Sequence, residues 1–385
     1  MTVDRRNFLK SAAAASAGLA GAPLGVEASL AGAAPAAKAE ADLTTEMQQW
    51  SEKDKLLRIA SCTWPIRSIF KSRGQGNPAS QELKKKYGEI TMLDFPQWTK
   101  DTFPGVTHMD IFSGLFGDVT DDSMFTQRTG GGPGTFDPST PSGRKWLEKM
   151  AAKQAATGVK CQHISNNAPT NLASADDALR KAGVDVGKKW LDGAVILGAK
   201  SVRMNSTSAL GPSIRPNALT SQEQQAKGLR GDGYVRNFDI IPLLEKAIES
   251  YKEMADHGGN LGIKVTFENH WGLAADPMNI RIMLDTINHP YCEASPDFCN
   301  WEHEYMLFNG LKALAPYSHT NVHAKYWDRW GDRNDVQRST RIMLAGGFKG
   351  TFALEYEAGP LNGIEGAQYL FKEVMAALSS PVPVS

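Results

Sequence analysis

The chain has 385 residues, and its 42 lysines and arginines are balanced by 42 aspartates and glutamates. This length is sufficient to bury a sizeable core, in one large domain or in two of ordinary size. The balanced charge argues against a protein built to bind nucleic acid or an anionic membrane surface, so we expect a partner that is a small molecule.

The N-terminal segment predicts export. Paired arginines, Arg5 and Arg6, precede a mildly apolar run at 11–24, and small residues that suit a signal peptidase recur at 31–36. We therefore expect 1–39 to be a twin-arginine signal peptide, recognised by the Tat export machinery and directing the protein to the periplasm or the extracellular space. The run is too short and too rich in small residues for a membrane anchor, so no span is expected in the mature protein.

The four cysteines are too few and too widely scattered for a disulfide framework. They are Cys62, Cys161, Cys292 and Cys299. Because no pair has C-x-x-C spacing, thiolate zinc sites and redox motifs are not expected. Whether any two of them form a disulfide is left open.

After a polar lead-in at 40–55, short apolar runs alternate with longer helical patterns. The apolar runs predict eight strands: 57–62, 105–111, 159–164, 201–204, 263–268, 292–297, 320–324 and 351–355. The clearest helical pattern covers 241–254, where apolar residues recur at three- and four-residue spacing.

This alternation predicts one α/β domain over 56–378, followed by a short tail at 379–385. Eight strands alternating with helices are typical of a (β/α)₈ TIM barrel, with a doubly wound open sheet as the alternative. Long connections at 71–83, 117–140 and 206–234 each follow a predicted strand, so we expect them to border the active face of the barrel.

Polar side chains stand at the ends of the last four predicted strands: Glu268, Asp297, His323 and Glu355. A barrel brings the carboxyl ends of its strands to one face, so these side chains should converge. Three carboxylates in one cavity cannot all stay ionised without a compensating cation. The pattern therefore predicts one divalent metal ion with mostly oxygen ligands, which is Mn²⁺, Mg²⁺, Co²⁺ or Zn²⁺.

At these strand ends the sequence resembles the sugar phosphate isomerase and epimerase superfamily, the xylose isomerase-like TIM barrels. The matching motifs are ENH at 268–270, DFCN at 297–300, VHAK at 322–325 and LEYE at 354–357. The first half departs from the sugar epimerases of this superfamily, both in the second strand, GVTHMDI at 105–111, and in the insert at 117–140.

The resemblance implies a single metal ion held by Glu268, Asp297, His323 and Glu355. It also implies that Glu268 and Glu355 lie on opposite sides of the substrate, where one removes a proton beside a carbonyl and the other returns it through a metal-bound enediolate. If Glu355 does not ligate the metal, Glu357 is the alternative.

Five further side chains are candidates for contacts with the substrate: His270, Lys325, Arg203, Trp64 and His163. His270 and Lys325 each follow a predicted ligand by two residues. Arg203 offers a bidentate hydrogen-bond donor, and the Trp64 ring can stack on a sugar. The structural alternative is a turn cap for His270, an ion pair for Arg203 and ordinary packing for Trp64.

We therefore expect a metal-dependent isomerase or epimerase that acts on a sugar or a related carbonyl compound. A lyase or hydratase that cleaves a 3-keto-glycoside would share the first proton abstraction, and a sugar-binding barrel without turnover is the non-enzyme alternative. An endonuclease would need further metal ligands and a basic groove. The substrate, the metal and any homo-oligomer are left open.

Overall fold

The computed structural model describes residues 46–47, 49–73, 76–127, 133–205, 240–270, 272–301 and 303–379. The predicted signal peptide, residues 40–45 and 48 of the lead-in, the predicted loop at 206–234 and the tail beyond 379 lie outside these residues. The chain divides into two compact units, Met1–Glu46 and Met47–Ser385, and every element described below belongs to the second unit.

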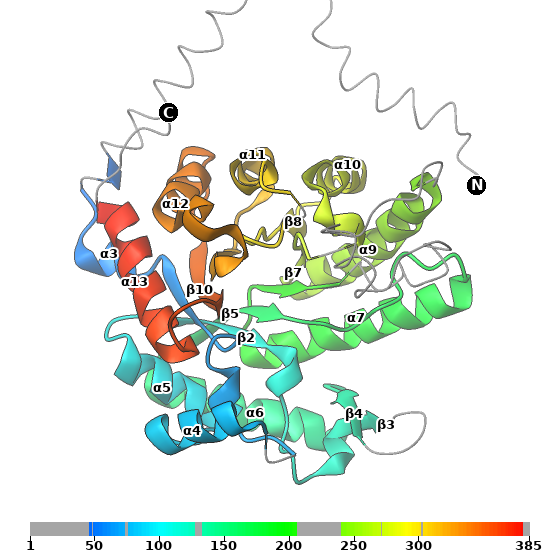
Figure 1. The fold of residues 1–385 in the computed structure, drawn as a ribbon. Helices are drawn as coiled ribbons and strands as arrows, with labels where there is room; N and C mark the ends of the chain where they lie inside the picture. The colour runs from blue at the N-terminus through cyan, green and yellow to red at the C-terminus, as the bar shows by residue number, and fades with distance from the viewer. Residues whose placement is uncertain are drawn as a thin grey trace, which may run out of the picture. The chain divides into compact units, whose positions relative to one another are not determined.

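The centre of this unit is a sheet of eight strands, and every neighbouring pair in it is parallel (Figure 1). The strands are β1 (Ile59–Cys62), β2 (His108–Phe112), β5 (Lys160–Ser165), β6 (Ser201–Arg203), β7 (Lys264–Phe267), β8 (Cys292–Ala294), β9 (Asn321–Trp327) and β10 (Thr351–Ala358). Each one overlaps a strand predicted from the sequence.

Hydrogen bonds between β9 and the segment just beyond β8 close the sheet into a barrel. The order of the strands is β8-β7-β6-β5-β2-β1-β10-β9, so chain order runs around the sheet. Just beyond β8, Asp297 forms a parallel bridge with His323 of β9. The amide of Phe298 donates to the carbonyl of His323, and the amide of His323 donates to that of Pro296, each at 3.1 Å. The arrangement is a TIM barrel and not an open, doubly wound sheet.

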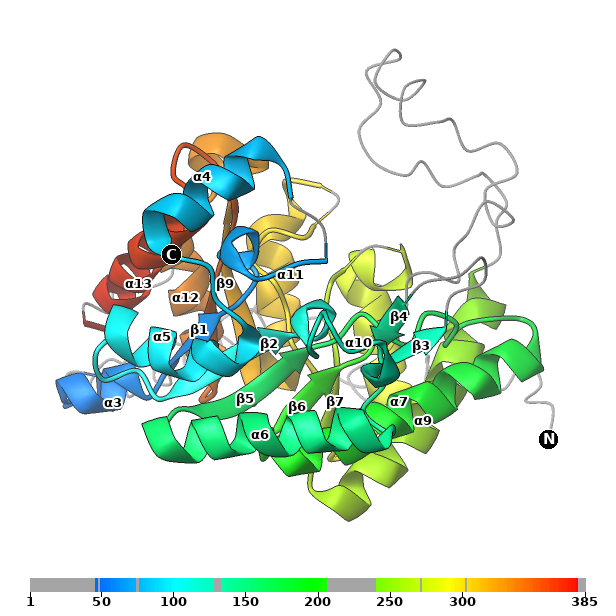
Figure 2. The same ribbon diagram turned by 90° about the horizontal axis from the view of Figure 1, so that it is seen from below.

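Helices cover the outside of the strands (Figures 1 and 2). They are α3 (Glu52–Leu56), α4 (Pro78–Tyr87), α5 (Phe95–Thr102), α6 (Pro141–Thr157), α7 (Asp177–Leu197), α9 (Ile241–Leu261), α10 (Pro277–Ile287), α11 (Met306–Leu314), α12 (Val336–Ala345) and α13 (Gly363–Ser379). The pattern predicted at 241–254 is confirmed, because Leu244, Tyr251 and Met254 of α9 are buried. Gly262 ends this helix with φ of 73°, in the left-handed region that glycine adopts without strain.

Two connections predicted as loops contain regular structure. Helix α4 begins inside the segment 71–83, because Asn77 caps it by accepting from the amide of Ser80 at 2.8 Å and Pro78 occupies its first turn. The segment 117–140 contains a hairpin of β3 (Phe125–Gln127) and β4 (Pro133–Phe136), which lies beside α7 in Figure 2.

All four cysteines are free thiols in this structure. Burial raises the pKa of Cys161 and of Cys292 above the usual value of a thiol, so neither is a reactive thiolate at neutral pH. Among the described residues, none of the helices is both long enough and apolar enough to cross a membrane.

Candidate metal centre

The four predicted ligands meet at the carboxyl ends of β7, β8, β9 and β10. The Nδ1 atom of His323 lies 3.4 Å from Oε2 of Glu268, 3.4 Å from Oε2 of Glu355 and 3.9 Å from Oδ2 of Asp297. All four side chains are buried, and Glu355 is the most exposed at 8%. Four consecutive strands therefore direct three carboxylates toward one imidazole nitrogen.

The period of two along a strand explains this convergence. In β9 the polar residues Asn321, His323 and Lys325 alternate with Val322 and Ala324, so the three polar side chains share the face that points into the barrel. Parallel pairing places Ala353 of β10 beside His323 and Glu355 beside Lys325. The carboxylate of Glu355 therefore reaches the imidazole from the neighbouring strand.

One side-chain amide and two backbone amides hold Asp297 in place. The side chain of Asn269, next to Glu268, makes two hydrogen bonds with the backbone of Asp297. Its Nδ2 donates to the carbonyl of Asp297 at 2.9 Å, and its Oδ1 accepts from the N–H of Asp297 at 2.7 Å. The backbone amides of Cys299 and Asn300 donate to Oδ1 of Asp297 at 2.6 and 2.9 Å. The two backbone amides occupy Oδ1 and leave Oδ2 to face His323.

The donor atoms fit a divalent cation. Oδ2 of Asp297 and Nδ1 of His323 are buried and make no hydrogen bond, although Nζ of Lys325 lies 3.3 Å from Oδ2. A buried polar atom left wholly without a partner costs about 1–3 kcal/mol. Glu268, Asp297 and His323 can each offer one ligand atom within 4.8 Å of the others. Atoms that bind one ion at about 2 Å necessarily lie this close together.

The charges of the site favour the same conclusion. Burial raises the pKa of Asp297 to about 7, where Glu355 and Glu268 add to the rise and Lys325 opposes it. Burial by itself would lower the pKa of His323, but Glu355, Glu268 and Asp110 together raise it well above its usual value. The surplus of negative charge therefore attracts positive charge, either as protons or as a metal cation.

Arg203 holds the Glu268 carboxylate. Burial would raise the pKa of Glu268, but Arg203 and His323 hold it well below its usual value. The Arg203 guanidinium donates through Nη1 to Oε2 of Glu268, through Nη2 to Oδ1 of Asn167 at 2.7 Å and through Nε to the carbonyl of Asn166 at 3.1 Å. Arg203 thus contacts a predicted ligand, and its contact with a substrate stays a prediction.

Lys325 holds the Glu355 carboxylate in the same way. Its Nζ lies 2.9 Å from Oε1 of Glu355, 3.3 Å from Oδ2 of Asp297 and 3.1 Å from Oε2 of Glu357. Asn300 joins the two halves of the site, because it donates to Oε1 of Glu268 at 3.0 Å and accepts from Lys325 at 3.1 Å. Asn300 is the last residue of the DFCN motif, but it was not predicted as a site residue.

Glu357 points to the rim and not to His323. It accepts from Nε1 of Trp64 at 2.6 Å and lies 3.7 Å from Arg67, whose guanidinium stacks on the Trp64 ring at 4.0 Å from its centre. The geometry therefore favours Glu355 over Glu357 as a ligand. Trp64 is partly exposed, and its stacking on a sugar stays a prediction.

The two remaining predicted contacts lie at different depths. His270 is partly exposed, and burial lowers its pKa to about 4, so its ring is neutral near the site. His163 is fully buried inside the barrel, where its Nδ1 lies 2.7 Å from Oγ of Ser201. A substrate contact is a prediction for both, and the full burial of His163 gives that role no support.

The sequence did not predict the buried carboxylate that lies beside His323. Asp110 of β2 is fully buried, and its Oδ2 lies 2.8 Å from Nε2 of His323. The available signal was a charged residue inside the otherwise apolar end of the second strand, at MDIF.

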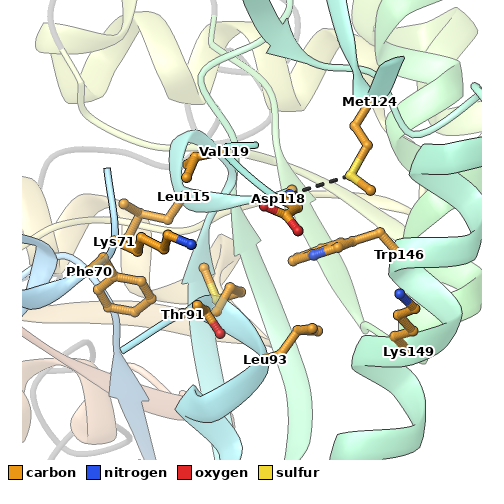
Figure 3. Close-up of a pocket in the computed structure, with 12 residues that line it drawn as sticks. Phe70, Lys71, Thr91, Leu93, Leu115, Asp118, Val119, Met124, Trp146 and Lys149 are labelled. Atoms are coloured by element: carbon orange, nitrogen blue, oxygen red, sulfur yellow. Dashed lines mark hydrogen bonds between the residues drawn. The ribbon is translucent and has the colours of Figure 1, made fainter. Parts of the chain in front are cut away.

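A separate hollow of about 120 Å³ lies beside the connection that follows β2 (Figure 3). Lys71 and Asp118 project into it from the connections after β1 and β2, and Trp146 of α6 forms one wall. Its described lining residues include none of the four predicted ligands, so this hollow is not part of the metal centre.

Comparisons with known proteins agree with the barrel fold. The matching family model is described as the xylose isomerase-like TIM barrel and covers residues 131–374. A xylose isomerase-like TIM barrel protein from Mycobacterium smegmatis, in complex with magnesium, is 18% identical, with a TM-score of 0.50 over 84% of this chain and 98% of that chain. A comparison with curated proteins found no match.

Two epimerases have similar structures. L-ribulose 3-epimerase is 13% identical, with a TM-score of 0.53 over 83% of this chain and 94% of that chain. The 3-keto-D-glucoside 4-epimerase from E. coli is 10% identical, with a TM-score of 0.50 over 82% of this chain and 99% of that chain. At these identities the similarity shows the fold alone.

Replacing Lys325 with methionine removes the buried positive charge beside Glu355 and Asp297. We expect the metal-free variant to lose on the order of 3 kcal/mol of unfolding free energy, because breaking a buried ion pair leaves uncompensated charge. Chemical denaturation in EDTA measures this loss. Mn²⁺ should then restore more stability to the variant than it adds to the wild type.

The matched control is Lys264→Met, which breaks a pair with Glu293 away from the predicted ligands. Its gain in stability on addition of Mn²⁺ should equal that of the wild type. A Lys325→Met variant as stable as the wild type in EDTA would contradict the assignment of Lys325.

Proposed function

The chain belongs to the xylose isomerase-like TIM barrel family, and from this membership we propose that it is a divalent-metal-dependent isomerase or epimerase of a sugar or a related carbonyl compound. The observation that carries the proposal is the convergence of Glu268, Asp297 and Glu355 on Nδ1 of His323. The epimerase activities named for L-ribulose 3-epimerase and 3-keto-D-glucoside 4-epimerase support it. We also propose that residues 1–39 direct export to the periplasm or beyond.

The proposed reaction moves a proton on a carbon next to a carbonyl. When bound by the four ligands, a divalent cation supplies a Lewis acid that polarises the carbonyl and stabilises negative charge on the substrate oxygens. One glutamate carboxylate takes the proton from carbon, and the electron pair of the broken C–H bond forms the enediolate. The other glutamate, in its protonated form, delivers a proton to carbon.

The partners of Glu268 and Glu355 suit them for this exchange. Each carboxylate has its own cation, Arg203 for Glu268 and Lys325 for Glu355, and Asn300 contacts both Glu268 and Lys325. These contacts fix the orientation of two carboxylates that lie equally far from His323. Carboxylates fixed in this way support the proposed proton transfer between the two faces of a substrate.

The metal is tested by elemental mass spectrometry of the mature protein purified without chelator. We expect about one divalent ion per chain in the wild type, and its loss from His323→Ala because a ligand is removed. The control is His257→Ala, which changes a histidine that pairs with Asp192 on the outer helices and should leave the metal content unchanged. A wild-type protein without metal would refute the proposal and favour a sugar-binding barrel without turnover.

Proton transfer is tested in D₂O with Mn²⁺, with free ketoses and 3-keto-glycosides as substrates. We expect deuterium to enter the carbon next to the carbonyl, detected by NMR. The Glu355→Gln variant should lose about 10²- to 10⁴-fold of this rate, because glutamine does not accept the proton. Glu357→Gln, two residues further along β10, should lose less than Glu355→Gln. A loss below tenfold in Glu355→Gln would remove Glu355 from the mechanism.

A second candidate function is a lyase or hydratase that cleaves a 3-keto-glycoside, and a cavity near Arg203 supports a glycoside as the substrate. The cavity has about 530 Å³ and lies between the connection after β2, the loop after β5 and α7. Its lining includes Asn167, which binds Arg203, and the aromatic ring of Phe125. Amides beside an aromatic ring suit a sugar, so the cavity offers room for the second group of a glycoside.

A substitution that fills this cavity separates the two substrate classes. Val186 lines the cavity from α7 and is 36% exposed, so Val186→Trp should fill it without disturbing the core. We expect kcat/KM for a 3-keto-glycoside to fall at least tenfold, while kcat/KM for a free ketose stays within about twofold. The control is Val195→Trp, at an exposed position on the same helix outside the cavity lining. Equal effects on both substrates would exclude the glycoside subsite.

A further inference from the structure

The nitrogen of His323 that faces away from the predicted ligands contacts a carboxylate from a distant strand. Asp110 belongs to β2, and β1 and β10 lie between β2 and β9 in the sheet. Its Oδ2 nevertheless lies 2.8 Å from Nε2 of His323, and both side chains are fully buried. This contact lies at the opposite end of the His323 ring from the nitrogen that faces the predicted ligands.

Both oxygens of Asp110 act as acceptors. Oδ2 also accepts from Nδ2 of Asn321 at 2.8 Å, and Oδ1 accepts from the hydroxyl of Ser165 at 2.7 Å. Because Ser165 gives its proton to Asp110, its oxygen is left to accept from Nε2 of His323 at 3.1 Å. Nε2 therefore faces two acceptors, and it carries a proton.

The opposite nitrogen of the same ring has the complementary environment. Nδ1 of His323 has no hydrogen-bond partner and faces the carboxylates of Glu268, Asp297 and Glu355. An imidazole that keeps its proton on Nε2 presents the lone pair of Nδ1 to a cation. The ring is therefore oriented for ligation through Nδ1.

We propose that Asp110 is a positioning residue that holds His323 with its proton on Nε2 and its Nδ1 lone pair directed at the metal ion. The inference rests on the proposed function, since it assigns a role toward the metal of that site. Carboxylates that accept from a ligating histidine fix the orientation of its ring and make it a stronger ligand, and their loss typically costs 10- to 100-fold in metal affinity.

A second cation on this side of His323 is the competing explanation. Asp110, His163 and His323 can each place one atom within 4.8 Å of the others. However, both oxygens of Asp110 already accept hydrogen bonds, and Nε2 of His323 lies between acceptors. These contacts describe a hydrogen-bond network, and the experiment below includes the metal stoichiometry as a check.

The test is the Mn²⁺ dissociation constant of Asp110→Asn, measured by competition with a chromogenic chelator. Asparagine has nearly the same shape, but its amide group donates where the carboxylate accepted. We expect affinity to fall 10- to 100-fold, with one ion per wild-type chain. The control is His163→Gln, which changes the buried neighbour paired in register with Asp110 and should leave the Mn²⁺ affinity unchanged.

A spectroscopic measurement separates positioning from a loss of folding. In the wild-type protein with ¹⁵N-labelled histidine and Zn²⁺ as the diamagnetic probe, we expect the His323 spectrum to show a protonated Nε2 and a coordinated Nδ1. Coordination through Nε2 would overturn the inference even if Asp110→Asn does not fold.

The remaining outcomes distinguish the two claims. Wild-type affinity in Asp110→Asn would overturn the role of Asp110 and leave the proposed function intact. Two ions per wild-type chain, with one lost in His163→Gln, would replace the network with a second cation. A wild-type protein that binds neither Mn²⁺ nor Zn²⁺ would refute the proposed function and this inference together.

Discussion

The central constraint on this structure is the burial of four carboxylates around one histidine. They belong to Asp110, Glu268, Asp297 and Glu355, and two buried cations, Arg203 and Lys325, lie among them. Buried charge is costly unless it is paired, so each of these groups requires the others. The asparagines and the serine that contact them orient the carboxylates, and a divalent cation would bring the cluster closer to neutrality.

The barrel is the reason that such a cluster can be built from scattered sequence. Each strand supplies one or two inward-facing positions near its carboxyl end, and parallel pairing sets them at matching depths. The outer helices and the apolar side chains between the polar positions exclude water. Consequently the site has a rigid frame, while the connections after β2 and β5 shape the cavity beside it.

The eight strands and the four convergent side chains were predictable, because apolar runs mark buried strands and each ligand candidate stands where a run ends. The role of Asp110 was not predictable, because its contact with His323 depends on β2 facing β9 across the barrel. No local sequence pattern indicates which strands face each other. The hairpin at β3 and β4 was hidden for a similar reason. Its residues form an ordinary glycine-rich connection in sequence, and only packing of Phe136 against Trp146 and Trp190 shows why it folds.

Asp297 and His323 have two structural roles, one for their backbones and one for their side chains. Their backbones form the bridge that joins the edge strands, while their side chains face each other as ligand candidates. Repulsion among the carboxylates would therefore act at the seam of the barrel. A cation bound there would hold the two sides of that seam together. Its removal would favour local opening between β8 and β9 before any global unfolding.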